Sequence, residues 1–417
     1  MTPRVLFASI AASAALAFAA PGSAAAQQPA VADSAIRCVV CHTSQRDALT
    51  EGIHVQHGIT CVTCHGGDPT SRTMATAHGS GFRGKLSKIA TAQLCASCHS
   101  DPNKMRQYGL QTDQFAEYRT SKHGQLLLVQ HNNDAPTCTD CHEAHVIYPP
   151  DDARSRVYPT NIPGTCARCH SDTQLMAKYH LPTTQLAEFR RSAHGVALFQ
   201  EQNFAAPTCI GCHGAHSALP PKVNEIGEVC GRCHELVAQE FSKGPHAAAV
   251  AAGKLPACLG CHSNHGTERV PADSIVHTCD RCHSANSKIH EMGVELQRRV
   301  IDATSDMQSA QRAVGELSLA GRRVTDYEFR YQTALTSYLQ IGQVQHSLDL
   351  TQLDQLGRQV RSISVDLGNA AETAAEQRWE HKLILAPVWF LALSALALGW
   401  LALRSIKRAK RSGGAED

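Results

Sequence analysis

The sequence contains no cysteine outside one repeated five-residue pattern. All 18 cysteines among its 417 residues belong to that pattern, so none is left over for a disulfide framework. Long apolar periodicity is missing from residues 38–283, which are rich in Pro and Gly, so a conventional hydrophobic core is not expected there. A strong charge of either sign is also missing, because the formal net charge is only +2, and this gives no electrostatic indication of a nucleic-acid partner.

The repeated pattern is Cys-x-x-Cys-His, and it occurs nine times. Two thiols three positions apart can bond to the two vinyl groups of a haem, and the histidine that follows can ligate its iron. Zinc ribbons, disulfide frameworks and redox-active cysteine pairs do not require that histidine. The pattern predicts nine covalently attached haem c groups on Cys38, Cys41, Cys61, Cys64, Cys95, Cys98, Cys138, Cys141, Cys166, Cys169, Cys209, Cys212, Cys230, Cys233, Cys258, Cys261, Cys279 and Cys282. The predicted proximal iron ligands are His42, His65, His99, His142, His170, His213, His234, His262 and His283.

The density of motifs determines the expected fold. Residues 38–283 provide roughly 27 residues for each motif, which is too short a loop to bury a core of its own. We therefore expect a mostly α and irregular fold, with the haems as the core of a cytochrome domain at 27–287. Each ferric haem adds about one negative charge, so nine of them change +2 to roughly −7, which disfavours nucleic acid as a partner.

An internal repeat supplies additional histidines. Segment 117–124 recurs as 188–195, an offset of 71 residues, and a shortened copy covers 239–246. Each copy has one histidine upstream of a motif and another three residues after a proximal histidine. A second imidazole on the iron makes a haem low-spin and suited to electron transfer. Nine distal ligands are predicted: His54, His57, His78, His123, His145, His194, His216, His246 and His265. The histidines left over are His131, His180, His277, His290, His346 and His381, of which His290 or His346 could replace one of the nine.

Both ends of the chain contain apolar segments. Residues 1–26 combine a basic residue, an apolar run and a small-residue cleavage site, which is typical of a secretory signal peptide; a retained anchor is the alternative. Residues 383–403 contain no charge and are long enough to cross a hydrocarbon layer of ~30 Å. Basic residues follow, so the positive-inside rule predicts a transmembrane helix at 382–403 and a cytoplasmic tail at 404–417. The haem domain would then face the periplasm or cell exterior; a buried core helix is the alternative.

The segment between the last motif and this apolar run has a different character. No proline occurs from Ala272 to Ala386, and helix-forming residues dominate. We expect long helices forming a hairpin or stalk at 288–381. Its apolar stripes would either pack against each other or form a docking surface for a partner subunit.

Three stretches of the chain indicate a family. Cys138-x-x-Cys141-His142-Glu143-Ala144-His145 has counterparts that end at His216 and His265, and a His-Gly element precedes such motifs. With the Cys-x-x-Cys-His-Gly-Gly-Asp-Pro stretch at 61–69, these features make residues 38–283 resemble the cytochrome c3-like, doubled-CxxCH group. The resemblance implies electron transport through close haems outside the cytoplasm, often beside a membrane cytochrome b that handles quinone. The Cys-x4-Cys-His motif of small c3 proteins is missing, and those proteins have no anchor.

Two classes of function remain. The first is a membrane-anchored periplasmic nonahaem cytochrome that relays electrons between a quinone-linked partner, such as a cytochrome b, and a periplasmic or extracellular acceptor. The second is a multihaem oxidoreductase acting on a small nitrogen or sulfur oxyanion, which would need an open iron position. Multihaem nitrite reductases use a motif ending in Lys, and no copy here does. Tyr148 and Tyr158 leave open a tyrosine-linked catalytic haem of the hydroxylamine oxidoreductase kind.

Overall fold

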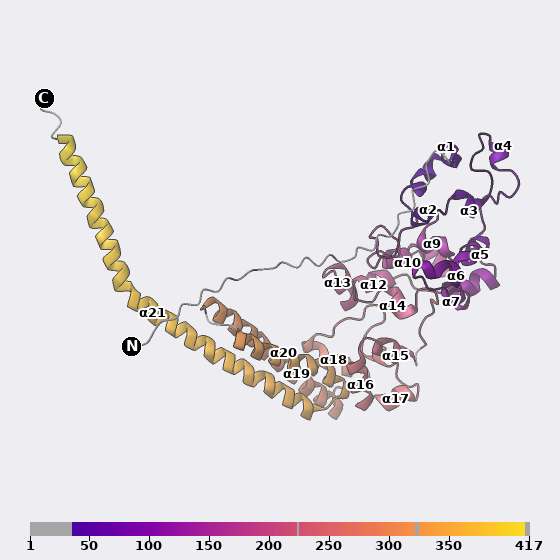
Figure 1. Cartoon of the computed structure of the whole chain (residues 1–417). Coiled ribbons are helices and arrows are strands. Elements are labelled where there is room, and N and C mark those ends of the chain that lie inside the picture. The colour runs from indigo at the N-terminus through magenta and orange to yellow at the C-terminus, as the bar shows by residue number, and fades with distance from the viewer. Residues whose placement is uncertain (1–35, 223–224, 322–324, 413–417) are drawn as a thin grey trace, which may run out of the picture. The chain divides into compact units, whose positions relative to one another are not determined.

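The computed structural model describes residues 36–222, 225–321 and 325–412 (Figure 1). These residues form helices and turns without a β-strand, which confirms the predicted mostly α fold. The signal peptide expected at 1–26 lies outside the described residues. The chain divides into two compact units: the first runs to Arg168 and includes Ala215–Ala218, and the second comprises Cys169–Gly214 and the chain from Leu219 onward.

The first unit consists of short helices joined by turns. Two of them, α3 and α9, are attachment motifs folded into a single helical turn, each begun by a capping box at Thr60 or Thr137. One turn puts residues three apart on the same face, so both cysteines of a motif can reach one haem. The elements are α1 (Cys38–Cys41), η2 (Thr43–Leu49), α2 (Ile53–Gln56), α3 (Cys61–His65), α4 (Met74–Ala77), α5 (Lys88–His99), α6 (Pro102–Met105), η3 (Arg106–Tyr108), α7 (Gln114–Thr120), α8 (Lys122–Gly124), η4 (Gln125–Val129), α9 (Cys138–His142) and α10 (Ile162–His170), whose end enters the second unit.

The second unit begins with helices of the same short kind. They are α11 (Thr173–Ala177), α12 (Gln185–Arg191), α13 (Ala193–Phe199), α14 (Cys209–His213), α15 (Ile226–Gly231), α16 (Glu235–Lys243), α17 (Ala247–Ala251), η6 (Cys258–Gly260), η7 (Ala272–Ser274) and α18 (Ile275–Asp280). Little of this part is a hydrophobic core. In the described residues before Lys288, one small cluster of buried hydrophobic side chains is found, of Ile36, Val39 and Val55 in the first unit, and other buried side chains such as Leu127 and Leu198 lie outside it.

The repeated His-Gly element has the same backbone arrangement in both full copies. The Ser192 hydroxyl caps α13 by accepting a hydrogen bond from the Gly195 amide at 2.9 Å, and Ser121 caps α8 in the same way. A Cβ on Gly195 would collide with the backbone oxygen of Phe189. The element therefore needs glycine because two helices meet there at close approach, and this fixes the backbone beside His194.

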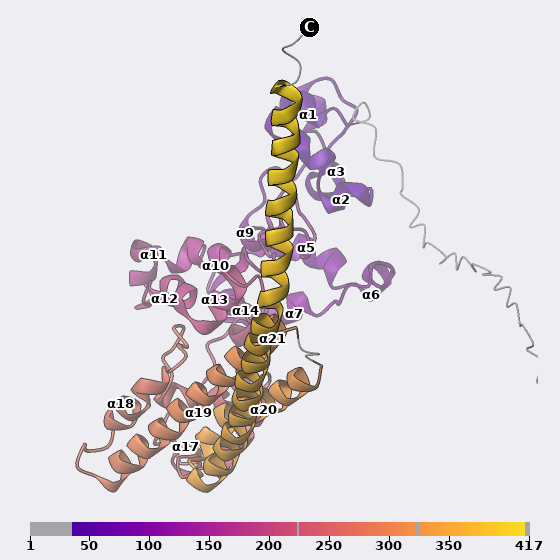
Figure 2. The ribbon, with the colours of Figure 1, turned by 90° about the vertical axis from the view of Figure 1, so that its left-hand side faces the viewer.

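Three long helices end the second unit: α19 (Lys288–Leu319), α20 (Thr325–Val344) and α21 (Leu350–Ser412), with the turn η8 (Gln345–Ser347) between the last two. Figures 1 and 2 show α19 and α20 beside the first half of α21. Two apolar clusters join the helices, and Leu317, Val360 and Leu367 within them are fully buried. The apolar stripes of this segment thus pack mainly against each other.

Polar contacts set a parallel register between α19 and α21. Near the start of both helices, Arg299 Nε donates to Asp354 Oδ1 at 2.6 Å. Near the far end, Arg378 Nη1 donates to the Leu319 backbone oxygen at 3.2 Å. The start of α19, which follows the last motif, and the apolar part of α21 therefore lie at opposite ends of the bundle.

By length and composition, α21 is the one described helix that could cross a membrane, and the side chains of its most apolar window are unburied. That window lies beyond the ends of α19 and α20, where α21 continues alone (Figures 1 and 2). The predicted span at 382–403 falls in this part of the helix. Residues 413–417 of the predicted tail lie outside the described residues.

Candidate haem-binding sites

Pairs of histidine rings are the main feature of the motif-bearing regions. Each of eight pairs among the described residues joins one proximal histidine of an attachment motif to one histidine outside the motifs. The pairs are His42–His78, His54–His99, His65–His145, His142–His216, His194–His234, His213–His265, His246–His283 and His262–His346. Such one-to-one matching is not expected of histidines brought together by chance.

The distance within the pairs fits two ligands on one iron. The ring centroids are 6.0–6.3 Å apart in all eight. Rings in direct contact lie closer, as His78 and Phe82 do at 4.2 Å. Two metal–nitrogen bonds of about 2 Å plus the radii of two imidazoles give a separation of roughly 6 Å. The residues present therefore fit haem with a histidine on each side of the iron.

The pairs differ from the predicted ligand set at one position: His57 faces a tyrosine, and His346, left over by the sequence analysis, lies within a pair. His57 packs edge-on against the ring of Tyr108, with centroids 4.7 Å apart. His346, from the turn η8, faces His262 instead. His123 and the proximal His170 stay the ligands that the sequence predicts. Sequence reasoning noted His346 only as a possible replacement, because nothing in a helical segment without motifs shows that it folds back onto one.

The pairing connects successive copies of the repeat. His145 follows the proximal histidine His142 by three residues, yet it faces His65 of an earlier motif. His142 is in turn paired with His216, which comes from the next copy. In the same way, His213 of the second copy is paired with His265 of the third. Each distal histidine of this kind therefore pairs with the proximal histidine two motifs earlier in the chain, so each of these sites is closed by a residue from a later part of the chain.

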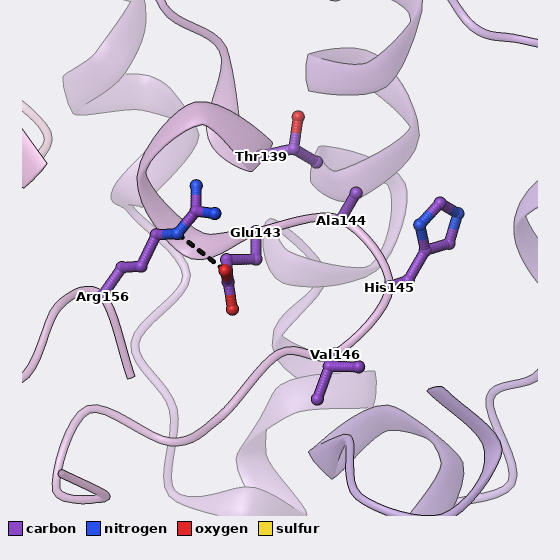
Figure 3. Close-up of a pocket in the computed structure, with 6 residues that line it drawn as sticks. All are labelled: Thr139, Glu143, Ala144, His145, Val146 and Arg156. Carbon is purple, nitrogen blue, oxygen red and sulfur yellow. Dashed lines mark ion pairs between the residues drawn. The ribbon is translucent and has the colours of Figure 1, made fainter. Parts of the chain in front are cut away.

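The turn after the proximal histidine explains this arrangement. Glu143 has φ 68°, in the left-handed region, and its side chain pairs with Arg156 at 2.6 Å. This ion pair borders a cavity of about 340 Å³, and His145 points away from the pair (Figure 3). The sharp turn directs two histidines that are close in sequence toward two different partner histidines.

Hydrogen bonds at Nδ1 leave Nε2 for a metal at several ligands. His65 Nδ1 lies 2.9 Å from the Gly84 backbone oxygen, and His213 Nδ1 lies 3.2 Å from that of Leu219. A carbonyl can only accept, so Nδ1 carries the proton and Nε2 keeps its lone pair. The backbone thus selects the tautomer that a haem iron needs.

Burial favours the neutral form of nine of the candidate ligand histidines. It lowers the pKa of His142 to about 4, with nearby His216 and His99 adding to the effect. Burial is also the main cause that lowers the pKa of His54, His99, His145, His170, His194, His216, His265 and His346. Neutral imidazole is the form that binds iron.

Consecutive motifs lie next to each other within each unit. Thiols of successive motifs lie beside each other: Cys38 beside Cys61, Cys95 beside Cys138, and Cys230 beside Cys258. An arginine inside a motif also donates to the backbone of the motif before it: Arg168 to Asp140, Arg232 to Gly211, and Arg281 to Cys261. Within each unit the order of the candidate sites therefore follows the sequence.

The chain is 26% identical over 223 residues to the multihaem cytochrome MtrA of Shewanella baltica, a match that covers 49% of this chain and 53% of that protein. This chain thus spans about half the length of the curated relative it matches. No solved structure and no protein-family model matches it.

Proposed function

We propose that this chain, a multihaem c-type cytochrome by its motifs and by its similarity to MtrA, relays electrons between a quinone-linked membrane partner and an acceptor outside the cytoplasm. The histidine pairing carries the proposal: seven proximal histidines face a histidine of the predicted distal set. Haem, when bound, supplies an iron that changes reversibly by one electron. Two imidazoles on that iron leave no open position for a substrate, which favours electron transfer over an oxidoreductase.

The spacing of the sites supports conduction. The closeness of thiols in successive motifs brings the attachment points of neighbouring haems together. Two distal histidines, His216 and His265, add a second link, because each pairs with a proximal histidine of the preceding copy of the repeat. We infer that haems close in sequence exchange electrons directly within each unit, and that the polypeptide acts mainly as their wrapping.

The C-terminal helices support a membrane location. The candidate span in α21 is followed at once by Arg404, Lys407 and Arg408, which favours a cytoplasmic end. The proposed topology places the motif-bearing region in the periplasm or cell exterior, after removal of residues 1–26 as a signal peptide.

The length of the helical bundle also bears on which partner can exchange electrons with the haems. The 32 residues of α19 extend for roughly 48 Å at the helical rise per residue, between the last motif and the end nearer the candidate span. A bundle of that length is able to hold the haems well away from the bilayer. We therefore propose that a membrane cytochrome b, or another quinone-reactive subunit, carries electrons across this distance rather than quinol itself.

The test is reduction by quinol with and without the partner. Purification in mild detergent should recover a multi-span b-type cytochrome with the chain. Stopped-flow spectra should then show fast reduction of the c haems in the complex and only slow reduction of the isolated chain.

The control is chemical reduction with dithionite, which should reduce the haems of the isolated chain fully. Rapid quinol oxidation by the isolated chain would contradict the need for a partner. Turnover of nitrite, hydroxylamine or tetrathionate at enzymatic rates would contradict the relay itself.

A further inference from the structure

The turn between α20 and α21 brings a histidine of the helical bundle to an attachment motif. The rings of His346 and His262 are 6.3 Å apart and 25° from parallel. This separation lies within the range of the seven pairs formed by predicted ligands. His346 belongs to η8, in a part of the chain without any attachment motif.

We propose that His346 is the distal iron ligand of the haem attached at Cys258 and Cys261. The helical bundle, rather than the motif-bearing region, then completes that site. This inference rests on the proposed function only in taking the chain to be a multihaem c-type cytochrome.

Hydrogen bonds orient both rings for this role. His346 Nδ1 lies 3.2 Å from the backbone oxygen of Gln343, and His262 Nδ1 lies 3.3 Å from that of Glu268. In both residues the proton is therefore on Nδ1, and Nε2 is the nitrogen with a free lone pair. The same arrangement occurs at His213, a proximal histidine of the preceding copy.

The turn that carries His346 is closely packed. A Cβ on Gly244, at the end of α16, would lie 2.9 Å from the His346 backbone oxygen and 3.3 Å from Cα of Ser347. Only glycine lets the two segments approach so closely. The Ser347 hydroxyl also donates to the Val344 oxygen at 2.7 Å, and Leu348 takes φ 59°. These contacts place the backbone of His346 independently of its side chain.

The internal repeat explains why the distal ligand of the Cys258 site comes from outside the motif-bearing region. Each earlier motif of the Cys-x-x-Cys-His-x-x-His kind receives its distal histidine from the copy that follows it. The motif at Cys258 is the last of that kind, since Asn286 stands where the Cys279 motif would need its histidine. His346 supplies the missing ligand and so ends the series.

A bond from iron to His346 would join the motif-bearing part of the second unit to the turn that leads into α21. Loss of the ligand should therefore both open one iron and loosen the bundle at this end.

The experiment replaces single histidines in the full-length holoprotein in detergent. His346→Ala should convert one haem of nine to a high-spin form that binds carbon monoxide when reduced, and added imidazole should restore the low-spin spectrum. His57→Ala, the matched control at the ligand that the sequence favoured, should leave the spin state unchanged. Electron paramagnetic resonance and optical spectra measure both.

A second variant distinguishes the loss of a ligand from misfolding of the protein. His346→Met keeps a ligand on the iron, so one haem should show methionine ligation and a raised midpoint potential. An unchanged low-spin spectrum in His346→Ala, or a high-spin haem in His57→Ala, would overturn the proposal. The proposed relay is judged separately by quinol reduction, so the spin change can be found even if the relay fails.

Discussion

At the scale of single residues, the histidines outside the motifs determine whether an iron is open or closed. His216→Ala removes the ring that faces His142, so one haem should become high-spin and bind carbon monoxide or cyanide. His180→Ala is the control, because His180 is exposed and belongs to no ring pair with a motif. Optical titration with carbon monoxide measures the result. Equal binding in the two variants would contradict the assignment of His216.

Gly195 of the repeated His-Gly element is expected to be important for the stability of the fold. Gly195→Ala puts a methyl group against the Phe189 backbone oxygen, so it should destabilise the protein by about 1–3 kcal/mol or more. Gly315→Ala in α19 is the control, since no other atom lies within 4 Å of the added Cβ and alanine favours a helix. Thermal unfolding of the two holoproteins should show a lowered midpoint only for Gly195→Ala. A loss of stability in the control would indicate that the helices are packed differently.

At the scale of elements, the two parts of the chain are stabilised differently. The long helices α19, α20 and α21 bury a hydrophobic core of their own. The short helices around the motifs bury few large side chains, so their stability should depend on haem attachment. The short helices are then expected to unfold when haem is not incorporated. The helical bundle should stay folded, because its apolar clusters do not involve haem.

The bundle core provides the element-scale prediction. Leu367 in α21 is fully buried, and Leu367→Ala should cost about 2–5 kcal/mol. Leu319, at the end of α19, is 78% exposed, so Leu319→Ala should change stability by less than about 0.5 kcal/mol. Denaturant unfolding followed by circular dichroism compares them. Similar losses in both variants would show that the bundle does not pack as described.

At the scale of the whole molecule, the haem count is the first expectation. Nine motifs, each with both cysteines free of disulfides, predict nine haems per chain held by two thioether bonds each. Intact mass and a pyridine haemochrome assay measure this number. A count below eight would contradict the interpretation of the motifs, and it does not depend on which histidines are distal ligands.

Membrane attachment is the second whole-molecule expectation. Cutting the chain after Gln377 removes the candidate span and keeps the buried residues of α21, so a soluble protein with its haems should be released. Ultracentrifugation without detergent measures the change against the full-length chain. Protease access to the tail from the periplasmic side would contradict the proposed orientation.

The sequence alone determined the features that depend on neighbouring residues. Attachment cysteines and proximal histidines lie within five residues of each other, so their chemistry does not depend on the fold. Leu353, Val360 and Leu367 recur at helical spacing, and all three are buried in the bundle. The mostly α fold followed from the same local patterns.

Only the tertiary structure decided which histidine ring faces which. His142 and His145 are three residues apart, but the turn at Glu143 separates them, and their partners come from other copies of the repeat. The choice between His57 and His346 likewise depends on a turn that packs against Gly244, far away in sequence. Such pairings depend on long-range packing, which spacing along the chain does not encode.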